Sequence, residues 1–199
     1  MKIARIYRLA YNVLFDLKYG RFLGGKKKTP YSLNGANDTA NSDYRAMSLI
    51  FKGKIKSDDV LVDVGCGKGR VLNFWISNFP KNQIVGIELD AEIAAKTAKR
   101  LRKYNNVNIL SGSVLELIPD NATIFYLFNP FNSSVMDMFK QSLIEKFFAK
   151  DKGWIHSFSI IYYNPVCANS FLEDDRFSCV KIEMPDGYHK VLFIKQSKI

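Results

Sequence analysis

Short apolar runs and amphipathic stretches alternate along most of the chain, from about residue 43 to residue 195. Short apolar runs bounded by turn residues are typical of buried strands, and apolar positions at three- and four-residue steps indicate helices. Strands are predicted at 60–64, 84–88, 107–110, 122–128, 154–163, 177–184 and 189–195. Helices are predicted at about 43–53, 71–79, 91–104, 133–150 and 167–173.

Strands that alternate with helices predict an α/β fold with a doubly wound, mostly parallel sheet that is covered on both faces. The last two strands are an exception, because the Pro-Asp-Gly link at 185–187 is short enough to join only antiparallel neighbours. The sequence therefore predicts one α/β domain over residues 43–199 that ends in an antiparallel hairpin. Residues 1–42 precede it as a separate helix and loop.

The N-terminal segment is a basic amphipathic helix. Its helical stripe ends near Gly20 and consists of Ile3, Ile6, Ala10, Val13, Leu14 and Leu17. Residues 1–28 contain eight Lys or Arg and one acid, Asp16, and so carry +7 of the net charge of +10. One interpretation is a helix packed on the flank of the domain with its basic side in water. The other is a partner-binding arm that contacts a polyanion, either nucleic acid or an anionic membrane surface. For residues 1–42 together, a lid is the alternative to such an arm.

Composition limits the class of protein. The chain has 199 residues, of which 47% are hydrophobic and 24% charged, as expected for one folded domain. It lacks an apolar run long enough to span a membrane and an N-terminal signal core. The three cysteines and two histidines show no metal-ligand spacing, so we expect no metal site and a cytoplasmic protein, with peripheral membrane contact left open.

The turn after the strand at 60–64 carries the first candidate chemistry. It reads D-V-G-C-G-K-G-R, with Asp63 two residues before a G-x-G-x-G triad at Gly65, Gly67 and Gly69. A dinucleotide fingerprint would read G-x-G-x-x-G, and a P-loop would place Lys-Ser or Lys-Thr after its second glycine. An acid at the mouth of the loop favours a cation over a diphosphate. The next strand ends in Glu88, a position suited to binding both hydroxyls of a ribose.

D-V-G-C-G-K-G-R followed by I-V-G-I-E-L-D resembles the first two motifs of the class I S-adenosylmethionine-dependent methyltransferases. The resemblance covers about three quarters of the chain and implies a seven-stranded sheet of order 3-2-1-4-5-7-6. It also implies S-adenosylmethionine as the cofactor. The implied cofactor-binding residues are Asp63, Gly65, Cys66, Gly67, Gly69, Glu88, Leu89, Ser113 and Asn129, with Ser113 standing where the family often has an acid.

Two predicted strands end in Asn-Pro, at Asn129-Pro130 and at Asn164-Pro165. In the implied sheet order these strands are neighbours, so both amides should stand at the edge that holds the cofactor. Methyltransferases that act on nitrogen are similar at the first site, where they carry Asn-Pro-Pro-aromatic; here Phe131 replaces the second proline. Asn129, Pro130, Phe131 and Asn164 are thus the candidate catalytic residues. The alternative is that each Asn only caps a helix or turn.

The sequence therefore predicts a methyltransferase that moves a methyl group to an unidentified acceptor, with a nitrogen of a protein, nucleic acid or small molecule as the suggested atom. Two rival hypotheses stay open at this point. One is a non-catalytic module of the same fold that binds nucleic acid or an anionic membrane through its basic helix. The other is a nucleotide-dependent oxidoreductase, which Asp63 and the glycine spacing disfavour.

Overall fold

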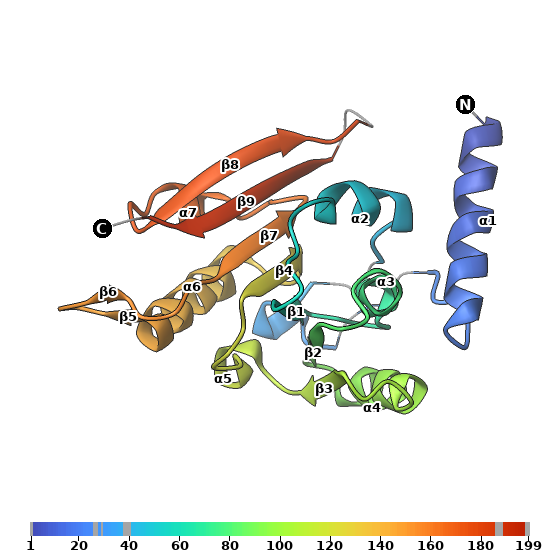
Figure 1. Cartoon of the computed structure of the whole chain (residues 1–199), viewed down its shortest axis with the longest axis horizontal. Helices are drawn as coiled ribbons and strands as arrows, with labels where there is room; N and C mark the ends of the chain where they lie inside the picture. The colour runs from blue at the N-terminus through green and yellow to red at the C-terminus, as the bar shows by residue number, and fades with distance from the viewer. Residues whose placement is uncertain (1, 26–27, 29, 38–40, 186–188, 198–199) are drawn as a thin grey trace.

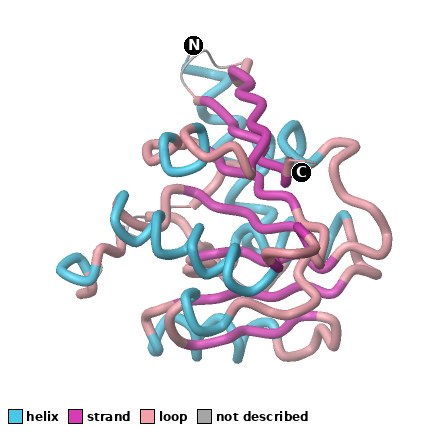
Figure 2. Tube along the Cα trace, turned by 90° about the vertical axis from the view of Figure 1, so that its left-hand side faces the viewer, coloured by secondary structure: helices cyan, strands magenta, loops and turns pink. Residues whose placement is uncertain are grey.

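A computed structural model describes residues 2–25, 28, 30–37, 41–185 and 189–197 of the chain (Figure 1). Seven strands form one sheet, of order β3-β2-β1-β4-β7-β9-β8. Its strands are β1 (Val60–Val64), β2 (Gln83–Glu88), β3 (Val107–Ser111), β4 (Ile124–Phe128), β7 (Ser159–Tyr163), β8 (Phe177–Glu183) and β9 (Lys190–Gln196). If β5 and β6, which form a separate sheet, are left out of the count, β7, β8 and β9 are the fifth, sixth and seventh strands. The order is then the 3-2-1-4-5-7-6 that the resemblance implies. Figure 2 shows the strands stacked through the middle of the molecule.

The sheet is parallel from β3 to β7 and antiparallel at β9 and β8, which confirms the predicted fold class. In β8 and β9 the register runs from Phe177 opposite Gln196 to Glu183 opposite Lys190. The predicted turn between them includes Asp186 and Gly187, which lie outside the described residues.

Helices cover both faces of the sheet because the buried strands alternate the direction of their apolar side chains. One core joins Val62, Val64, Phe125 and Leu127 to α5 (Val114–Leu117), α6 (Ser133–Phe147) and α7 (Asn169–Leu172). The other core joins Leu61 and neighbouring strand residues to helices on the opposite face. These helices are α2 (Tyr44–Phe51), α3 (Arg70–Asn78) and the end of α4 (Ala91–Leu101).

Two predicted elements are wrong in part. The strand predicted at 154–163 begins only at Ser159, because β6 (Gly153–Trp154) turns back onto β5 (Phe148–Ala149) as a separate two-stranded sheet. The helix predicted to reach residue 150 accordingly ends at Phe147. The short helix α5 was not predicted; Ser113 caps it by accepting a hydrogen bond from the Leu115 N–H (3.2 Å).

The N-terminal helix α1 (Lys2–Lys18) stands at the side of the domain, near α3 and α2 (Figure 1). The helix lies on the flank of the domain with Arg8 and Lys18 exposed, but its apolar stripe is not the face that contacts the domain. Asn12, Asp16 and Tyr19 are buried, whereas Ile6, Ala10, Leu14 and Leu17 are exposed. Val13 is half-buried, and the side chain of Ile3 lies outside what the structure describes. A polar and aromatic face therefore holds α1 against the domain.

Candidate active site

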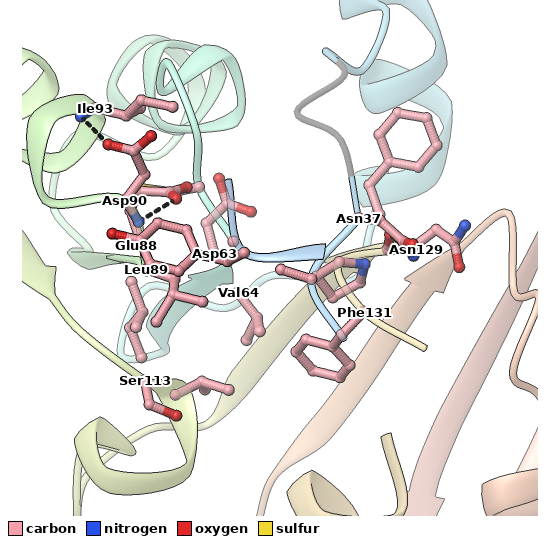
Figure 3. Close-up of a pocket in the computed structure, with 18 of the residues that line it drawn as sticks. Asn37, Asp63, Val64, Glu88, Leu89, Asp90, Ile93, Ser113, Asn129 and Phe131 are labelled. Carbon is pink, nitrogen blue, oxygen red and sulfur yellow. Dashed lines mark hydrogen bonds between the residues drawn. The ribbon is translucent and has the colours of Figure 1, made fainter. Parts of the chain in front are cut away.

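A cavity of about 460 Å³ opens at the carboxyl ends of β1, β2 and β4. Figure 3 shows acidic side chains from β1 and β2 at one side of it and the Asn129–Phe131 segment at the other. Most predicted site residues line the cavity: Asp63, Gly65, Cys66, Glu88, Leu89, Ser113, Asn129, Pro130 and Phe131. Gly67, Gly69 and Asn164 are not among the lining residues.

The three glycines of the turn have different structural roles. Gly65 (φ 72°) is exposed at the cavity, and a Cβ there would lie 3.1 Å from the Pro130 Cβ. The backbone N–H of Gly67 donates to Glu88 Oε2 (2.7 Å). Gly69 (φ 78°) precedes α3, and a Cβ there would lie 2.9 Å from side-chain atoms of α4. Gly65 alone of the three therefore keeps the cavity wall free of a side chain.

Helix α4 clamps this turn from outside the cavity. The hydroxyl of Thr97 donates to the Gly67 carbonyl (3.0 Å), and Arg100 donates to the Lys68 carbonyl (2.8 Å). The Cys66 side chain is buried behind the turn, and this burial raises the pKa of its thiol well above the ordinary value. Helix α4 therefore holds the turn in place. Cys66 is a packed residue whose thiol stays protonated.

Asp63 is the most unusual group in the cavity wall. It is 3% exposed, and its Oδ2 is buried without a hydrogen-bond partner among the described residues. Burial, and secondly the nearby charge of Glu88, raise the pKa of the Asp63 carboxyl well above its usual range. An unsatisfied buried acceptor at a cavity wall is an expensive arrangement, and a ligand donor or cation would relieve it.

Glu88, at the end of β2, is held by backbone groups. Its Oε2 accepts from Gly67 and its Oε1 accepts from the N–H of Asp90 (2.9 Å). Burial raises the pKa of Glu88, and these two N–H donors partly offset that rise. Each carboxylate oxygen keeps a second acceptor position. Asp90 itself caps α4 through bonds from Glu92 and Ile93 (both 3.0 Å), so its carboxylate has a structural task (Figure 3).

The two Asn-Pro strand ends share an uncommon backbone conformation. Phe128 pairs with Tyr163, so β4 and β7 end level with each other. Asn129 (φ 48°) and Asn164 (φ 51°) are the two non-glycine residues with positive φ in the described part of the chain. Residues before proline prefer extended backbone, so both positions are strained, and asparagine tolerates this conformation better than most residues.

Only the first of these amides reaches the cavity. Neither Asn129 nor Asn164 caps a helix; α6 is capped by Asn132, which accepts from the Val135 N–H (3.0 Å). The Asn129 side-chain Oδ1 accepts from the hydroxyl of Tyr162 (3.3 Å), and its backbone carbonyl accepts from Asn37 Nδ2 (3.0 Å). Burial raises the pKa of Tyr162, which keeps its hydroxyl protonated as a donor. The role of Asn164 stays a prediction.

The loop before α2 folds over the Asn129–Asn132 segment. Ala36 and Phe131 form an antiparallel bridge, and Asn37 N–H donates to the Pro130 carbonyl (2.9 Å). Asn132 N–H donates in turn to the Gly35 carbonyl (2.8 Å). Tyr31, Asn37, Asn41 and Ser42 of this loop line the cavity. Part of residues 1–42 thus forms a wall of the site.

Arg70 is a cavity-lining residue that sequence reasoning missed. It is 7% exposed and pairs with the fully buried Asp16 of α1 through Nε (3.0 Å) and Nη2 (2.5 Å). Asp16 also accepts from the Tyr44 hydroxyl (2.8 Å) and the Leu23 N–H (3.0 Å). The signal that could have indicated the pair is a single acid inside a segment of eight cations.

The cavity suits the cofactor that the resemblance implies. Its volume lies in the range of small-molecule sites, roughly 300–1,000 Å³. The unpartnered Asp63 oxygen offers an acceptor for a cationic or hydrogen-bonding group, and the exposed Gly65 backbone allows close approach. S-adenosylmethionine, when bound, supplies an electrophilic methyl group on a positively charged sulfur. Among the described residues, no group of His, Cys, Asp or Glu side chains is placed to hold a metal ion.

Comparison with known proteins agrees with this chemistry. The family model of a methyltransferase domain matches residues 61–150. A protein-lysine N-methyltransferase of Saccharolobus islandicus is 26% identical over 115 residues, which are 56% of this chain and 70% of the relative. A ribosomal RNA small subunit methyltransferase A of a Hydrogenobaculum species is 26% identical over 139 residues, 60% of this chain and 54% of the relative.

A solved structure shares the fold. An RNA methyltransferase of Salinibacter ruber, in complex with S-adenosyl-L-homocysteine, superposes with a TM-score of 0.62 at 16% identity, over 81% of this chain and 95% of that one. The family match falls on the strands and turn that build the cavity, and the first two motifs lie in it. The match to a methyltransferase domain, the methyltransferase relatives and the shared fold together support an S-adenosylmethionine-dependent methyltransferase, with S-adenosylmethionine as its cofactor.

Proposed function

We propose that the cofactor lies against the β1 and β2 side of the cavity. The residues that support this placement are Asp63, Gly65, Cys66, Glu88, Leu89 and Ser113, all of which line the cavity. Asp63 would accept from the amino-acid part and Glu88 from the ribose hydroxyls. Gly67 and Gly69 would act indirectly. Gly67 holds the Glu88 carboxylate through its N–H, and Gly69 lacks a side chain that would collide with α4.

We infer that the methyl acceptor is a nitrogen and that Asn129 binds it by accepting hydrogen bonds from its N–H groups. A nitrogen acceptor must present its lone pair, and its N–H groups can be held by fixed acceptor oxygens. Asn129 offers two such oxygens, each already fixed by one protein donor and each with a second acceptor position. This double fixation at the cavity edge is the observation that carries the proposal. Pro130 and Phe131 would form the adjoining wall.

A second hollow, of about 830 Å³, supports an amine as the acceptor. It shares Asn37, Asn129 and Phe131 with the cavity, so the two hollows adjoin at Asn129. Asp137 and Glu173 lie along it, and its one lysine, Lys140, is paired with Asp174 (3.2 Å). An acidic groove attracts a cationic amine and repels nucleic acid phosphate.

The proposed acceptor is therefore a lysine side chain of a protein. The Saccharolobus relative, a protein-lysine N-methyltransferase, agrees with it. The Hydrogenobaculum relative acts on ribosomal RNA by name, so a nucleobase nitrogen is the alternative to test. The rival of a non-catalytic module gains no support from these features, since the cavity, the paired amide oxygens and the family match all fit transfer chemistry.

The proposal is tested at Asn129 with two substitutions. Asn129→Ala and Asn129→Gly both remove the side-chain oxygen, so both should lower methyl transfer to lysine-rich peptides and leave S-adenosylhomocysteine affinity unchanged. Only Ala is strained at a φ of 48°, by ~1 kcal/mol, so Gly controls for stability. Label from methyl-labelled cofactor that enters RNA and not protein would contradict a lysine acceptor, and full activity of the Gly variant would contradict the role of Asn129.

We also propose that residues 1–42 serve as a lid over the site or as a partner-binding arm. The bridge from Ala36 to Phe131 supports the first role. The +7 charge of residues 1–28 supports a polyanionic partner for the second.

A further inference from the structure

Helix α1 is anchored to the domain by polar and aromatic contacts on one side. Asn12 Nδ2 donates to Asp43 Oδ2 (2.7 Å), and Asn12 Oδ1 accepts from the Tyr44 N–H (3.1 Å). One turn further on, Asp16 pairs with Arg70. These bonds determine which face of α1 points outward, because rotating the helix would withdraw Asp16 and leave Arg70 buried without its partner.

The outward face of α1 is apolar. Ile6 is 65% exposed, Leu14 69% and Leu17 52%, and Leu9 at the flank is 59% exposed. Aromatic side chains widen the surface: Tyr7, Tyr11 and, just after the helix, Phe22. Soluble monomers rarely expose so continuous an apolar surface unless it binds something. We call the surface formed by Ile6, Leu9, Leu14 and Leu17 the α1 stripe.

The charge of the N-terminal segment indicates which partner fits the α1 stripe. The single acid of residues 1–28, Asp16, is buried in its pair with Arg70, and Lys18, Arg21 and Lys28 are exposed. A second copy of the chain would bring like charges together. Nucleic acid would satisfy the cations and leave the stripe in water. An anionic lipid surface satisfies both, because acyl chains accept apolar side chains while headgroups attract lysine and arginine.

We propose that α1 lies in the plane of an anionic membrane surface, with the α1 stripe inserted among the lipids. No helix in the described part of the chain is long and apolar enough to cross a membrane. At 17 residues α1 is about 25 Å long, which suits an in-plane helix. The helix is bonded to the cavity wall through Arg70, so the catalytic domain would sit directly on the membrane. This inference goes beyond the proposed methyl transfer and does not depend on its acceptor.

Vesicle co-sedimentation tests the proposal. The full chain should sediment with vesicles of phosphatidylcholine and phosphatidylglycerol, less with added salt, and weakly with phosphatidylcholine alone. Leu14→Gln with Leu17→Gln should lower partitioning by about tenfold or more. The free energy of inserting two leucine side chains into lipid is larger than that of a tenfold change in affinity. The matched control is Leu49→Gln with Leu172→Gln, where the leucines are 55% and 51% exposed on other elements. It should bind as the unchanged protein does.

Three results would overturn the proposal: no sedimentation with anionic vesicles, equal binding by the α1 pair and the control pair, or a dimer in sedimentation velocity that the α1 pair dissociates. Because both leucines are exposed, the α1 pair should keep its folded circular dichroism spectrum and its S-adenosylhomocysteine affinity. Failure of vesicle binding therefore leaves the methyl-transfer proposal untouched, and failure of methyl transfer leaves the membrane proposal untouched.

Discussion

Asp63→Asn should make the protein more stable without ligand and weaken its hold on the cofactor. The Asp63 carboxyl is 3% exposed, and one of its oxygens has no hydrogen-bond partner in the described part of the chain. Folding therefore removes a carboxylate from water without compensation. Asparagine has nearly the same shape and no charge, so it escapes most of this cost, but it cannot give the cofactor an anionic acceptor.

The size of both effects follows from the unsatisfied group. An unpaired buried polar group costs ~1–3 kcal/mol and a charged one costs more, so removing the charge of Asp63 should recover an amount of this order. For a domain of this size, each 1 kcal/mol shifts the melting temperature by roughly 2–4 °C. The ligand-free variant should thus melt several degrees higher than the unchanged protein. Its affinity for S-adenosylhomocysteine should fall by roughly five- to a hundredfold, the equivalent of a lost charged hydrogen bond.

The gain in stability should depend on pH with a definite sign. Burial raises the pKa of Asp63 well above the value of an unfolded aspartate. Below about pH 4 the carboxyl is protonated in both states and costs little. As the pH rises, the unfolded chain ionises first, so the stability of the unchanged protein falls by about 1.4 kcal/mol per pH unit until the raised pKa is passed. The advantage of the Asn variant should appear above about pH 4 and vanish below it.

Thermal unfolding with and without S-adenosylhomocysteine, followed by circular dichroism over this pH range, measures both effects. Asp58→Asn is the control, because Asp58 is exposed and loses the same charge. It should change neither melting temperature nor ligand stabilisation. An Asp63→Asn variant that melts lower than the unchanged protein at neutral pH, or that keeps its full ligand-induced shift, would refute the reasoning.

Two further changes test the neighbouring parts of the site. Gly65→Val should abolish the binding heat with S-adenosylhomocysteine, because the new side chain would enter the cavity. Its backbone has a φ of 72°, and its Cβ would lie 3.1 Å from the Pro130 Cβ. Binding by a folded variant would exclude Gly65 from the cofactor site. Asp16→Ala should lower the free energy of unfolding in urea by ~3–5 kcal/mol, because it leaves the Arg70 guanidinium buried and unpaired. A loss below about 1 kcal/mol would show that water reaches Arg70 readily.

Local chemistry was sufficient to predict the turn and the strand ends. Asp63, Gly65 and Glu88 lie at the junctions of apolar strands with their loops, and such junctions of parallel strands gather at one edge of the sheet. The separate roles of Gly67 and Gly69 could not be predicted in this way. They depend on Thr97 and Arg100, which come from a helix some thirty residues later and reach the turn only in the folded sheet. The same holds for Tyr162, which fixes the side chain of Asn129 from a neighbouring strand.

The orientation of α1 shows a different limit. A helical period identifies two faces, and the usual rule assigns the apolar one to the core. The rule fails here because the surface of the domain beside this helix is polar. Arg70, Asp43 and Tyr44 on that surface hydrogen-bond to polar side chains of α1. Turning the apolar face inward would leave that arginine buried without its partner, at a cost of ~3–5 kcal/mol. A lone acid in a basic helix is therefore better evidence for the inward face than the apolar period, because a buried cation elsewhere in the chain needs that acid.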